Sequence, residues 1–215
     1  MIGLIKLLKI LFFRYTPFGT PKYPLKIEPI QIAYLINEIE KLKLVKASII
    51  EVGVGKGLTT RFLAEHIESQ KMEKNNQYVA LDTFSTFEES DSKYELLIRE
   101  QNITKKKMVY NDFKTWKKNF KKYNFIHPIQ EDCKHFDYNS IAPIKITLLN
   151  VKYYLPTKIA LEKIYSATIS GGVIMVDDVQ LGDVSDGAYK AYYEFCDENN
   201  IIPKIIGNKC GLIYK

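Results

Sequence analysis

Apolar residues along the chain follow two spacings in turn, which predict buried strands and amphipathic helices. Runs rich in apolar and β-branched residues predict strands at 48–52, 78–82, 126–130, 144–149 and 172–176, with a closing hairpin at 201–206 and 212–214. Apolar residues three and four positions apart predict helices at 29–43, 58–72, 156–165 and 187–198. Continuous apolar strands that alternate with helices indicate a parallel sheet covered on both faces. We therefore predict an α/β domain over 29–215 with a doubly wound, mostly parallel seven-stranded sheet and an antiparallel C-terminal hairpin.

Residues 1–28 are predicted to form a separate element, a short helix over 1–13 followed by a linker with three prolines. The apolar stretch of this helix is too short to span a bilayer, and Lys6 and Lys9 lie on one of its faces. Two placements remain open for it. The helix lies weakly on a membrane surface, or it docks on the body of the protein or on a second subunit of a homodimer.

An excess of about forty residues, 84–123, separates the second and third predicted strands and is too long for a plain crossover. Its second half interleaves lysines with apolar and aromatic residues at helical spacing. One interpretation is an electropositive lid that recruits an anionic acceptor or a nucleic acid. The other, which we favour, is a helix with an aromatic core face and a solvated lysine face. The residues are Lys105, Lys106, Lys107, Lys114, Lys117, Lys118, Lys121 and Lys122, with Val109, Phe113, Trp116 and Phe120 between them.

Composition limits the class of protein without naming a function. The chain has 215 residues, 46% of them hydrophobic and 26% charged, which is ordinary for a globular domain. A net charge of +6 permits an anionic partner without requiring one. The three cysteines include no C-x-x-C pair, which argues against a zinc site or a disulfide framework. A reducing compartment is therefore expected, the cytoplasm, with peripheral membrane contact if the first helix binds lipid.

A glycine-rich turn directly follows the first predicted strand and directly precedes a helix. Gly53, Gly55 and Gly57 would let the backbone turn sharply and approach a ligand, with Glu51 just before them. Dinucleotide-binding enzymes use a similar turn, so this motif alone is weakly specific. Asp82 ends the second strand, where a carboxylate can accept hydrogen bonds from a ribose diol. Asp132 follows the third strand and can accept from an adenine amino group. Together these positions predict a site for a nucleoside cofactor.

This arrangement resembles the S-adenosylmethionine-dependent methyltransferase fold, which is Rossmann-like. Three stretches, 150–157, 171–178 and 187–191, resemble the macrocin-type (TylF-like) sugar O-methyltransferases, in which the first reads D-x-D-x-Y-x-P-T and the second ends in D-D. The resemblance covers about residues 45–215 and includes Asp82-Thr83-Phe84, which matches D-[ST]-F in the family. It implies S-adenosyl-L-methionine as cofactor. The implied binding residues are Glu51, Gly53, Gly55, Gly57, Asp82, Thr83, Asp132 and Asn150.

The chain departs from the family at the D-x-D motif. In the family the first Asp helps the later Asp pair to hold magnesium, and the second Asp is the general base. Here those positions are Asn150 and Lys152, whereas Asp177 and Asp178 are kept. Because Mg²⁺ prefers several carboxylate ligands, we expect no bound metal; if one binds, Asp177 and Asp178 are the ligands that remain.

Lys152 is interpreted as a fixed cation that stands in for the metal and pairs with Asp177 or Asp178. Neighbouring carboxylates raise the pKa of a lysine, which makes Lys152 a poor base at neutral pH. The catalytic candidates are therefore Lys152 as the cation, Asp178, and His135, whose intrinsic pKa suits proton transfer. The pair 153–154 supplies two tyrosines as further candidate bases.

Two functions remain open at this point. The first is an O-methyltransferase that acts on a sugar hydroxyl of a glycoside or a polysaccharide precursor. The second is a catalytically impaired protein of the same fold that binds the cofactor and serves as a scaffold or subunit. The intact cofactor half favours the first, and the replacements at Asn150 and Lys152 favour the second. A small-molecule or glycan acceptor is expected, and a nucleic-acid partner is not, because the chain has no recognition module.

Overall fold

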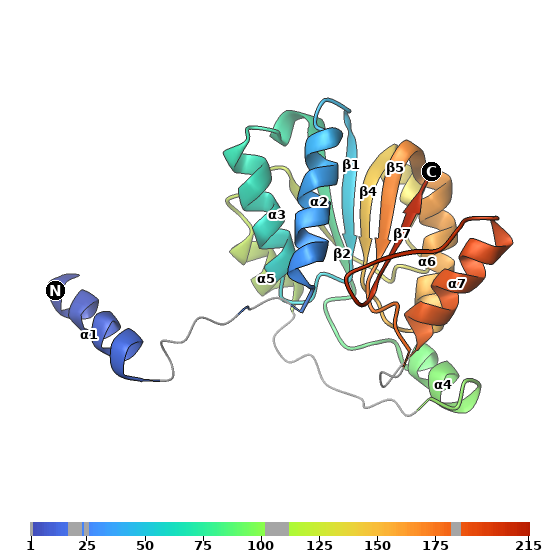
Figure 1. The fold of residues 1–215 in the computed structure, drawn as a ribbon, viewed down its shortest axis with the longest axis horizontal. Helices are drawn as coiled ribbons and strands as arrows, with labels where there is room; N and C mark the ends of the chain where they lie inside the picture. Colours follow the sequence, from blue (N-terminus) through green and yellow to red (C-terminus); the bar gives the residue numbers. More distant parts are fainter. Residues whose placement is uncertain (1, 17–22, 24–25, 102–111, 182–185) are drawn as a thin grey trace.

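A seven-stranded sheet with helices on both faces forms the body of the protein (Figure 1). The computed structural model describes residues 2–16, 23, 26–101, 112–181 and 186–215. The strands are β1 (Ala47–Val52), β2 (Asn76–Asp82), β3 (Ile126–Gln130), β4 (Ile144–Leu149), β5 (Thr168–Val176), β6 (Lys204–Ile206) and β7 (Cys210–Tyr214). The α-helices are α1 (Ile2–Tyr15), α2 (Pro29–Lys41), α3 (Leu58–Ser69), α4 (Glu89–Leu97), α5 (Phe113–Asn119), α6 (Tyr154–Ala167) and α7 (Gly187–Glu198). Two 3₁₀ turns, η2 (Glu73–Asn75) and η3 (Tyr138–Ile141), complete the described elements.

The strands lie in the order β3-β2-β1-β4-β5-β7-β6. The first five strands in this order are parallel to one another, whereas β7 runs antiparallel between β5 and β6. The chain therefore winds outward in one direction from β1 to β3 and in the other from β4 to β5, which puts a reversal of strand order between β1 and β4. This confirms the predicted doubly wound sheet with an antiparallel C-terminal hairpin.

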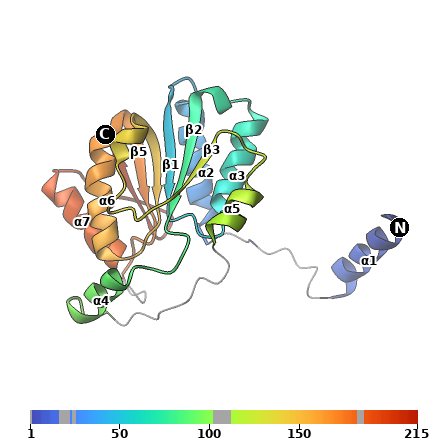
Figure 2. The ribbon, with the colours of Figure 1, turned by 180° about the vertical axis from the view of Figure 1, so that it is seen from behind.

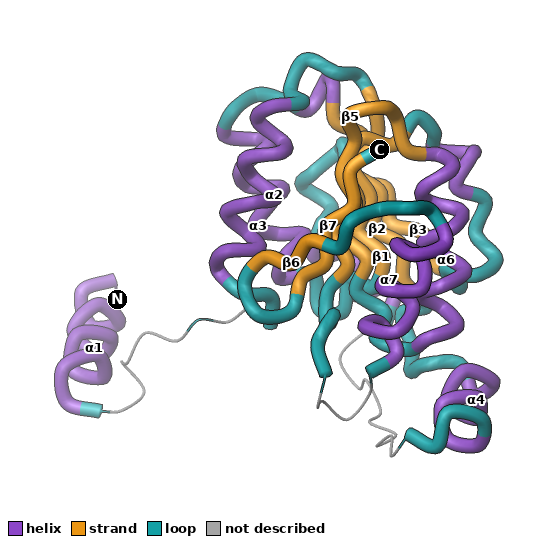
Figure 3. The backbone as a smooth tube through the Cα atoms, turned by 45° about the vertical axis from the view of Figure 1, so that its right-hand side comes forward, coloured by secondary structure: helices purple, strands orange, loops and turns teal. Residues whose placement is uncertain are grey.

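Two hydrophobic layers hold the helices against the sheet. Helices α2, α3 and α5 cover one face, and α6 and α7 cover the other (Figures 2 and 3). Successive strand residues point to opposite faces, so Ile49 joins the first layer and Ile50 the second. Because both faces are covered, β1 and β4 are buried along their whole length, which explains their continuous apolar sequence.

Two described helices, α4 and α5, belong to the insert between β2 and β3. Trp116 and Phe120 of the α5 region pack in the core while Lys117 and Lys118 are exposed, which confirms the aromatic-face interpretation for the described part of the insert. Lys105, Lys106, Lys107 and Val109 lie outside the described residues. Helix α4 was not predicted from the sequence; it contacts α6 and lies at the lower edge of the sheet in Figure 1.

The N-terminal segment contains one helix that lies apart from the sheet and one residue that is buried in the body. Helix α1 lies apart from the sheet, and its leucines and phenylalanines are exposed (Figures 1 and 3). Ile27, in contrast, is buried in the first hydrophobic layer, so the chain joins the body before residue 28. Among the described residues, no helix is both long enough and apolar enough to cross a membrane. The three cysteines are free and buried.

Candidate functional site

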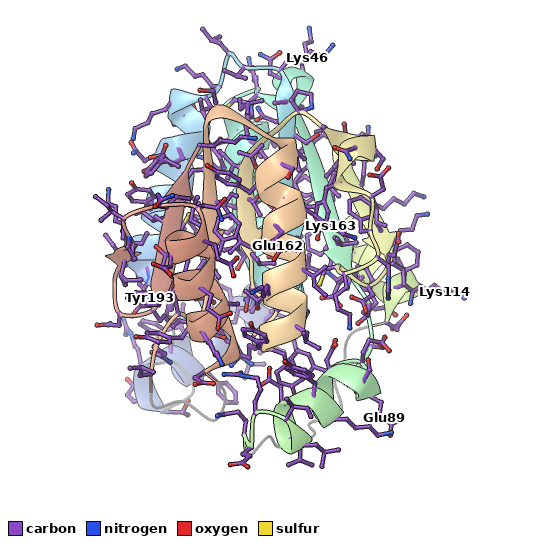
Figure 4. All side chains as sticks on the ribbon, turned by 90° about the vertical axis from the view of Figure 1, so that its right-hand side faces the viewer. Lys46, Glu89, Lys114, Glu162, Lys163 and Tyr193 are labelled. Atoms are coloured by element: carbon purple, nitrogen blue, oxygen red, sulfur yellow. The ribbon has the colours of Figure 1, made fainter. Side chains whose placement is uncertain are left out.

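A cavity of about 370 Å³ opens at the carboxyl ends of the parallel strands, where the strand order reverses between β1 and β4. Open α/β sheets bind their ligands at such a reversal. The strand ends contribute 51–56, 81–83, 131–133 and 150–152 to its lining. The insert and the segment before α2 complete the walls with Ser85, Phe87, Glu88, Asp91, Lys26 and Ile27. Figure 4 shows Glu89 of α4 and Lys46, which precedes β1, at opposite ends of the molecule, so α4 lies at the cavity end.

The glycine turn is pressed against the end of β4. Gly53 has a left-handed backbone, φ +85°, and a Cβ atom there would lie 2.1 Å from the carbonyl oxygen of Asn150. Only glycine allows this approach. Gly57 is different, because a Cβ atom at this position would lie 2.5 Å from the ring of Phe120. It starts α3 beside the aromatic side of the insert and is not among the residues that line the cavity, so the structure places it in packing.

Glu51 is a buried carboxylic acid in the cavity wall. Its Oε2 accepts hydrogen bonds from the hydroxyls of Thr60 and Tyr78, each at 2.6 Å. Burial raises the pKa of Glu51 to about 7, although these two hydrogen bonds act in the opposite direction. Near neutral pH this side chain can therefore take either protonation state in response to a ligand.

Asp82 ties the loops after β1 and β2 together. One carboxylate oxygen accepts the N–H of Gly55 at 3.1 Å, and the other accepts the N–H of Phe84 at 2.7 Å. Thr83 lines the cavity beside it. The carboxylate is thus held at the strand end, where the sequence places a partner for a ribose diol.

Asp132 shares a lysine with a residue that sequence reasoning missed. Lys134 forms ion pairs with Asp91 of α4 and with Asp132, the latter at 3.2 Å. Both acids line the cavity, and burial raises the pKa of Asp91. The link fastens α4 to the loop after β3 and so closes this wall. His135 follows in the same loop, but its side chain is exposed and it is not among the lining residues.

The acid pair after β5 holds two lysines. Lys152 Nζ lies 3.1 Å from Asp178 Oδ2, which is the ion pair that the sequence predicts for Lys152. Lys209 lies on the same acids, with its Nζ 3.0 Å from Asp177 Oδ1 and 2.6 Å from Asp178 Oδ1. Lys209 was missed because no motif marks it. Its place follows from the sheet, since β7 runs antiparallel beside β5 and therefore begins where β5 ends.

The two carboxyl groups of the pair differ in electrostatics. Burial, and after it the negative charge of Asp178, raises the pKa of Asp177. Burial also acts to raise the pKa of Asp178, but the hydrogen bond from Lys209 and the charge of Lys152 outweigh it, so this pKa lies below its ordinary value. Asp178 is therefore ionised in the folded protein at neutral pH.

The two tyrosines after Lys152 are fixed by packing. The Tyr153 ring lies 4.2 Å from that of Phe87, and burial raises its pKa. The Tyr154 hydroxyl donates to Glu194 at 2.5 Å, and its backbone N–H donates to Glu95 of α4 at 2.5 Å. Both rings thus position the loop that carries Lys152.

Comparison with known proteins identifies the family and the fold of the chain. The sequence model of the family described as Macrocin-O-methyltransferase (TylF) matches residues 31–208. No curated protein sequence is detectably similar to the chain. The structure of the O-methyltransferase NovP has 15% sequence identity and a TM-score of 0.71, with 96% of this chain and 88% of that chain covered. CalS11, a calicheamicin methyltransferase, has 14% identity and a TM-score of 0.66, with 99% and 91% covered.

Structures with lower TM-scores have the same fold. An apo structure of CalS11 is described as a TDP-rhamnose 3′-O-methyltransferase; it has a TM-score of 0.59 at 14% identity, with 99% of this chain and 93% of that chain covered. A Streptococcus mutans protein in complex with SAH has a TM-score of 0.51 at 15% identity, with 87% and 97% covered. At such low identity these likenesses show the fold, and the family match identifies the kind of protein. The chain belongs to the macrocin-O-methyltransferase (TylF) family and has its Rossmann-like methyltransferase fold.

Proposed function

We propose that this protein is an S-adenosylmethionine-dependent O-methyltransferase that acts on a sugar hydroxyl. The cavity at the reversal of strand order is the observation that carries the proposal, because one concave site collects a glycine turn, Asp82 and Asp132. In this site Asp82 would hold the ribose hydroxyls and Asp132 the adenine amino group. Glu51 and the glycine turn would hold the amino-acid end of the cofactor.

The residues of the chain would bind and orient both reactants. Bound S-adenosylmethionine would supply an electrophilic methyl group for attack by the acceptor oxygen; the C–S electron pair would stay on sulfur and the hydroxyl proton would pass to solvent. Alignment of the two reactants supplies much of the rate in such a displacement. Lys152 lines the cavity and can donate a hydrogen bond to an oxygen of the acceptor. Its partner Asp178 holds the ammonium in place.

Cofactor binding tests the first half of the proposal. Asp82→Ala should weaken binding of S-adenosylmethionine by about 1–3 kcal/mol in a calorimetric titration, the usual cost of leaving hydrogen-bond partners unpaired. Glu162→Ala, on the exposed face of α6, is the matched control and should bind as the unchanged protein does. Equal affinity in the Asp82 variant would contradict the assigned site.

Turnover separates the enzyme from the alternative, a cofactor-binding scaffold of the same fold. The family description and the description of NovP support O-methylation. The description of CalS11 as a TDP-rhamnose 3′-O-methyltransferase supports a sugar acceptor. Nucleotide sugars and glycosides should therefore be offered with S-adenosylmethionine and the products weighed by mass spectrometry. A methylated sugar is the expected result. Cofactor binding without methylation of any offered sugar would favour the scaffold.

We also propose that α1 contacts a membrane surface rich in anionic lipid. Leu4, Leu8 and Leu11 recur at helical spacing and are exposed, while Lys6 and Lys9 lie on another side of the helix. The helix contains no acidic residue, so its charge complements an anionic surface and opposes pairing with a second copy. The cytoplasmic location and the homodimer stay predictions.

A further inference from the structure

Lys209 bridges the two aspartates that follow β5. It is the last residue of the turn between β6 and β7, and its carbonyl oxygen accepts the N–H of Val179 at 2.8 Å. Val179 follows Asp178, so this hydrogen bond sets Lys209 beside the acid pair. Its side chain is 15% exposed, and its ammonium lies within 3.0 Å of a carboxylate oxygen of each aspartate. One largely buried cation therefore serves both acids.

Lys152 holds the other side of the pair and faces the cavity. Its side chain is 43% exposed. Its ammonium pairs with Asp178 Oδ2, whereas Lys209 lies closest to Asp178 Oδ1. Both Lys152 and Asp178 have left-handed backbones, with φ of 61° and 59°. Residues other than glycine adopt this conformation at a cost, so the surroundings must impose it.

The start of α7 imposes the Lys152 backbone. The N–H of Ala188 donates to the Lys152 carbonyl oxygen at 2.9 Å. A Cβ atom at Gly187 would lie 2.4 Å from the Tyr154 nitrogen, so α7 presses closely on this loop. The backbone from which Lys152 extends its ammonium group is thus held in place by the fold.

These residues do not fit the magnesium ion that the family implies. Mg²⁺ needs oxygen ligands at about 2.0–2.1 Å in octahedral geometry. Here the ammonium groups of the two lysines form ion pairs with oxygens of both carboxylates. The amide of Gln31 also donates a hydrogen bond to Asp177 Oδ1, at 2.9 Å. The remaining family ligand is replaced by the neutral Asn150. Among the described residues, no group of three or more His, Cys, Asp and Glu side chains is placed to hold a metal ion.

We propose that Lys209 and Lys152 replace the divalent metal ion of the family at the Asp177–Asp178 pair. Two lysines and two aspartates make a neutral centre, to which a divalent ion would add an uncompensated charge of the same sign as the lysines. Lys209 holds the acids together, and Lys152 presents the positive charge to the acceptor. The role toward the acceptor rests on the proposed function, whereas the absence of metal binding does not.

Titration of Mg²⁺ alone into the native, chelator-treated protein is the first test. We expect no saturable heat, and the same melting temperature in EDTA as in excess MgCl₂. Saturable binding, together with a higher melting temperature in MgCl₂, would overturn the proposal. This measurement needs no variant and no acceptor.

Rebuilding the acid cluster is the second test. The triple change Asn150→Asp, Lys152→Asp and Lys209→Ala restores the family's acids and removes the bridging cation. It should make the melting temperature rise on addition of MgCl₂, whereas the double change Asn150→Asp with Lys152→Asp should respond less because Lys209 remains. Lys46→Asp, at the opposite end of the molecule, controls for charge and should show no response (Figure 4). A folded triple variant whose melting temperature does not change with MgCl₂ would contradict the proposal. If the triple variant fails to fold, the Mg²⁺ titration of the native protein decides.

A parallel titration with S-adenosylmethionine separates this inference from the proposed function. If the protein binds both S-adenosylmethionine and Mg²⁺, the proposal of a metal-free centre is wrong and the proposed function is unaffected. Absence of both kinds of binding overturns the proposed function and leaves the centre as described.

Discussion

Glu51 is the residue whose environment most alters its chemistry. Its side chain is 3% exposed, and its folded-state pKa of about 7 lies above the ordinary 4.5. Between these two values the folded protein binds more protons than the unfolded chain, so stability falls as pH rises through this window. The protonated form of Glu51 is therefore the form that stabilises the unliganded fold.

Glu51→Gln should remove this pH dependence. A neutral amide can still accept the hydrogen bonds of Thr60 and Tyr78, so near pH 8 the variant should be more stable by about 3 kcal/mol, with little difference near pH 4. Urea unfolding across this range measures it, with exposed Glu162→Gln as control. The same loss of stability with pH in both variants would contradict the assignment to Glu51.

Lys152 and Lys209 should differ in their effect on stability. The sequence suggests that loss of Lys152 leaves two acids facing each other without a cation, but the structure shows that Lys209 would remain between them. Lys152→Ala should therefore cost about 1 kcal/mol or less, as for an exposed ion pair. Lys209→Ala should cost about 3 kcal/mol, because it leaves the buried Asp177 without a cation.

Thermal unfolding of the two alanine variants checks this order, with Lys46→Ala as the control for loss of an exposed lysine. A Lys152 variant that is less stable than the Lys209 variant would reverse the roles assigned to the two cations.

At the scale of elements, the sequence predicts what is apolar and periodic. The strands and the long helices carry that signal, and the structure confirms them. Helix α4 does not, because its buried residues are Asp91, Ser92 and Glu95, which are polar. Glu95 is satisfied by Arg99 and by the Tyr154 backbone, partners that no local pattern reveals. Lys209 was not predicted from the sequence for the same reason, since its contacts come from the pairing of β7 with β5.

Helix α1 should bind lipid independently of cofactor binding. The full chain should co-sediment with vesicles that contain phosphatidylglycerol and not with neutral phosphatidylcholine vesicles, and added salt should release it. Deleting residues 1–14 should abolish co-sedimentation and leave cofactor affinity within a factor of about three, because α1 lies apart from the sheet (Figure 1) and none of its described residues lines the cavity.

Lys6→Glu with Lys9→Glu should also abolish vesicle binding, whereas Lys46→Glu should not. Vesicle binding that survives the deletion would place the lipid contact elsewhere. A change of the oligomeric state on deletion would instead show that α1 joins two copies of the chain.

At the scale of the whole molecule, the site is assembled from segments far apart in the sequence. The reversal of strand order brings the glycine turn after β1 next to Asn150 after β4. The insert and the segment before α2 close the cavity through Asp91 and Ile27. The sequence could predict the strand-end residues from their motifs, but not these walls, because their placement depends on tertiary contacts.

A calorimetric titration of S-adenosylmethionine into the full chain in the presence of EDTA tests the central claim most directly. The account predicts saturable binding that is unchanged when MgCl₂ replaces EDTA, since the cavity holds the cofactor and lysines hold the acid pair. No binding of S-adenosylmethionine, combined with saturable binding of a nicotinamide dinucleotide, would contradict it.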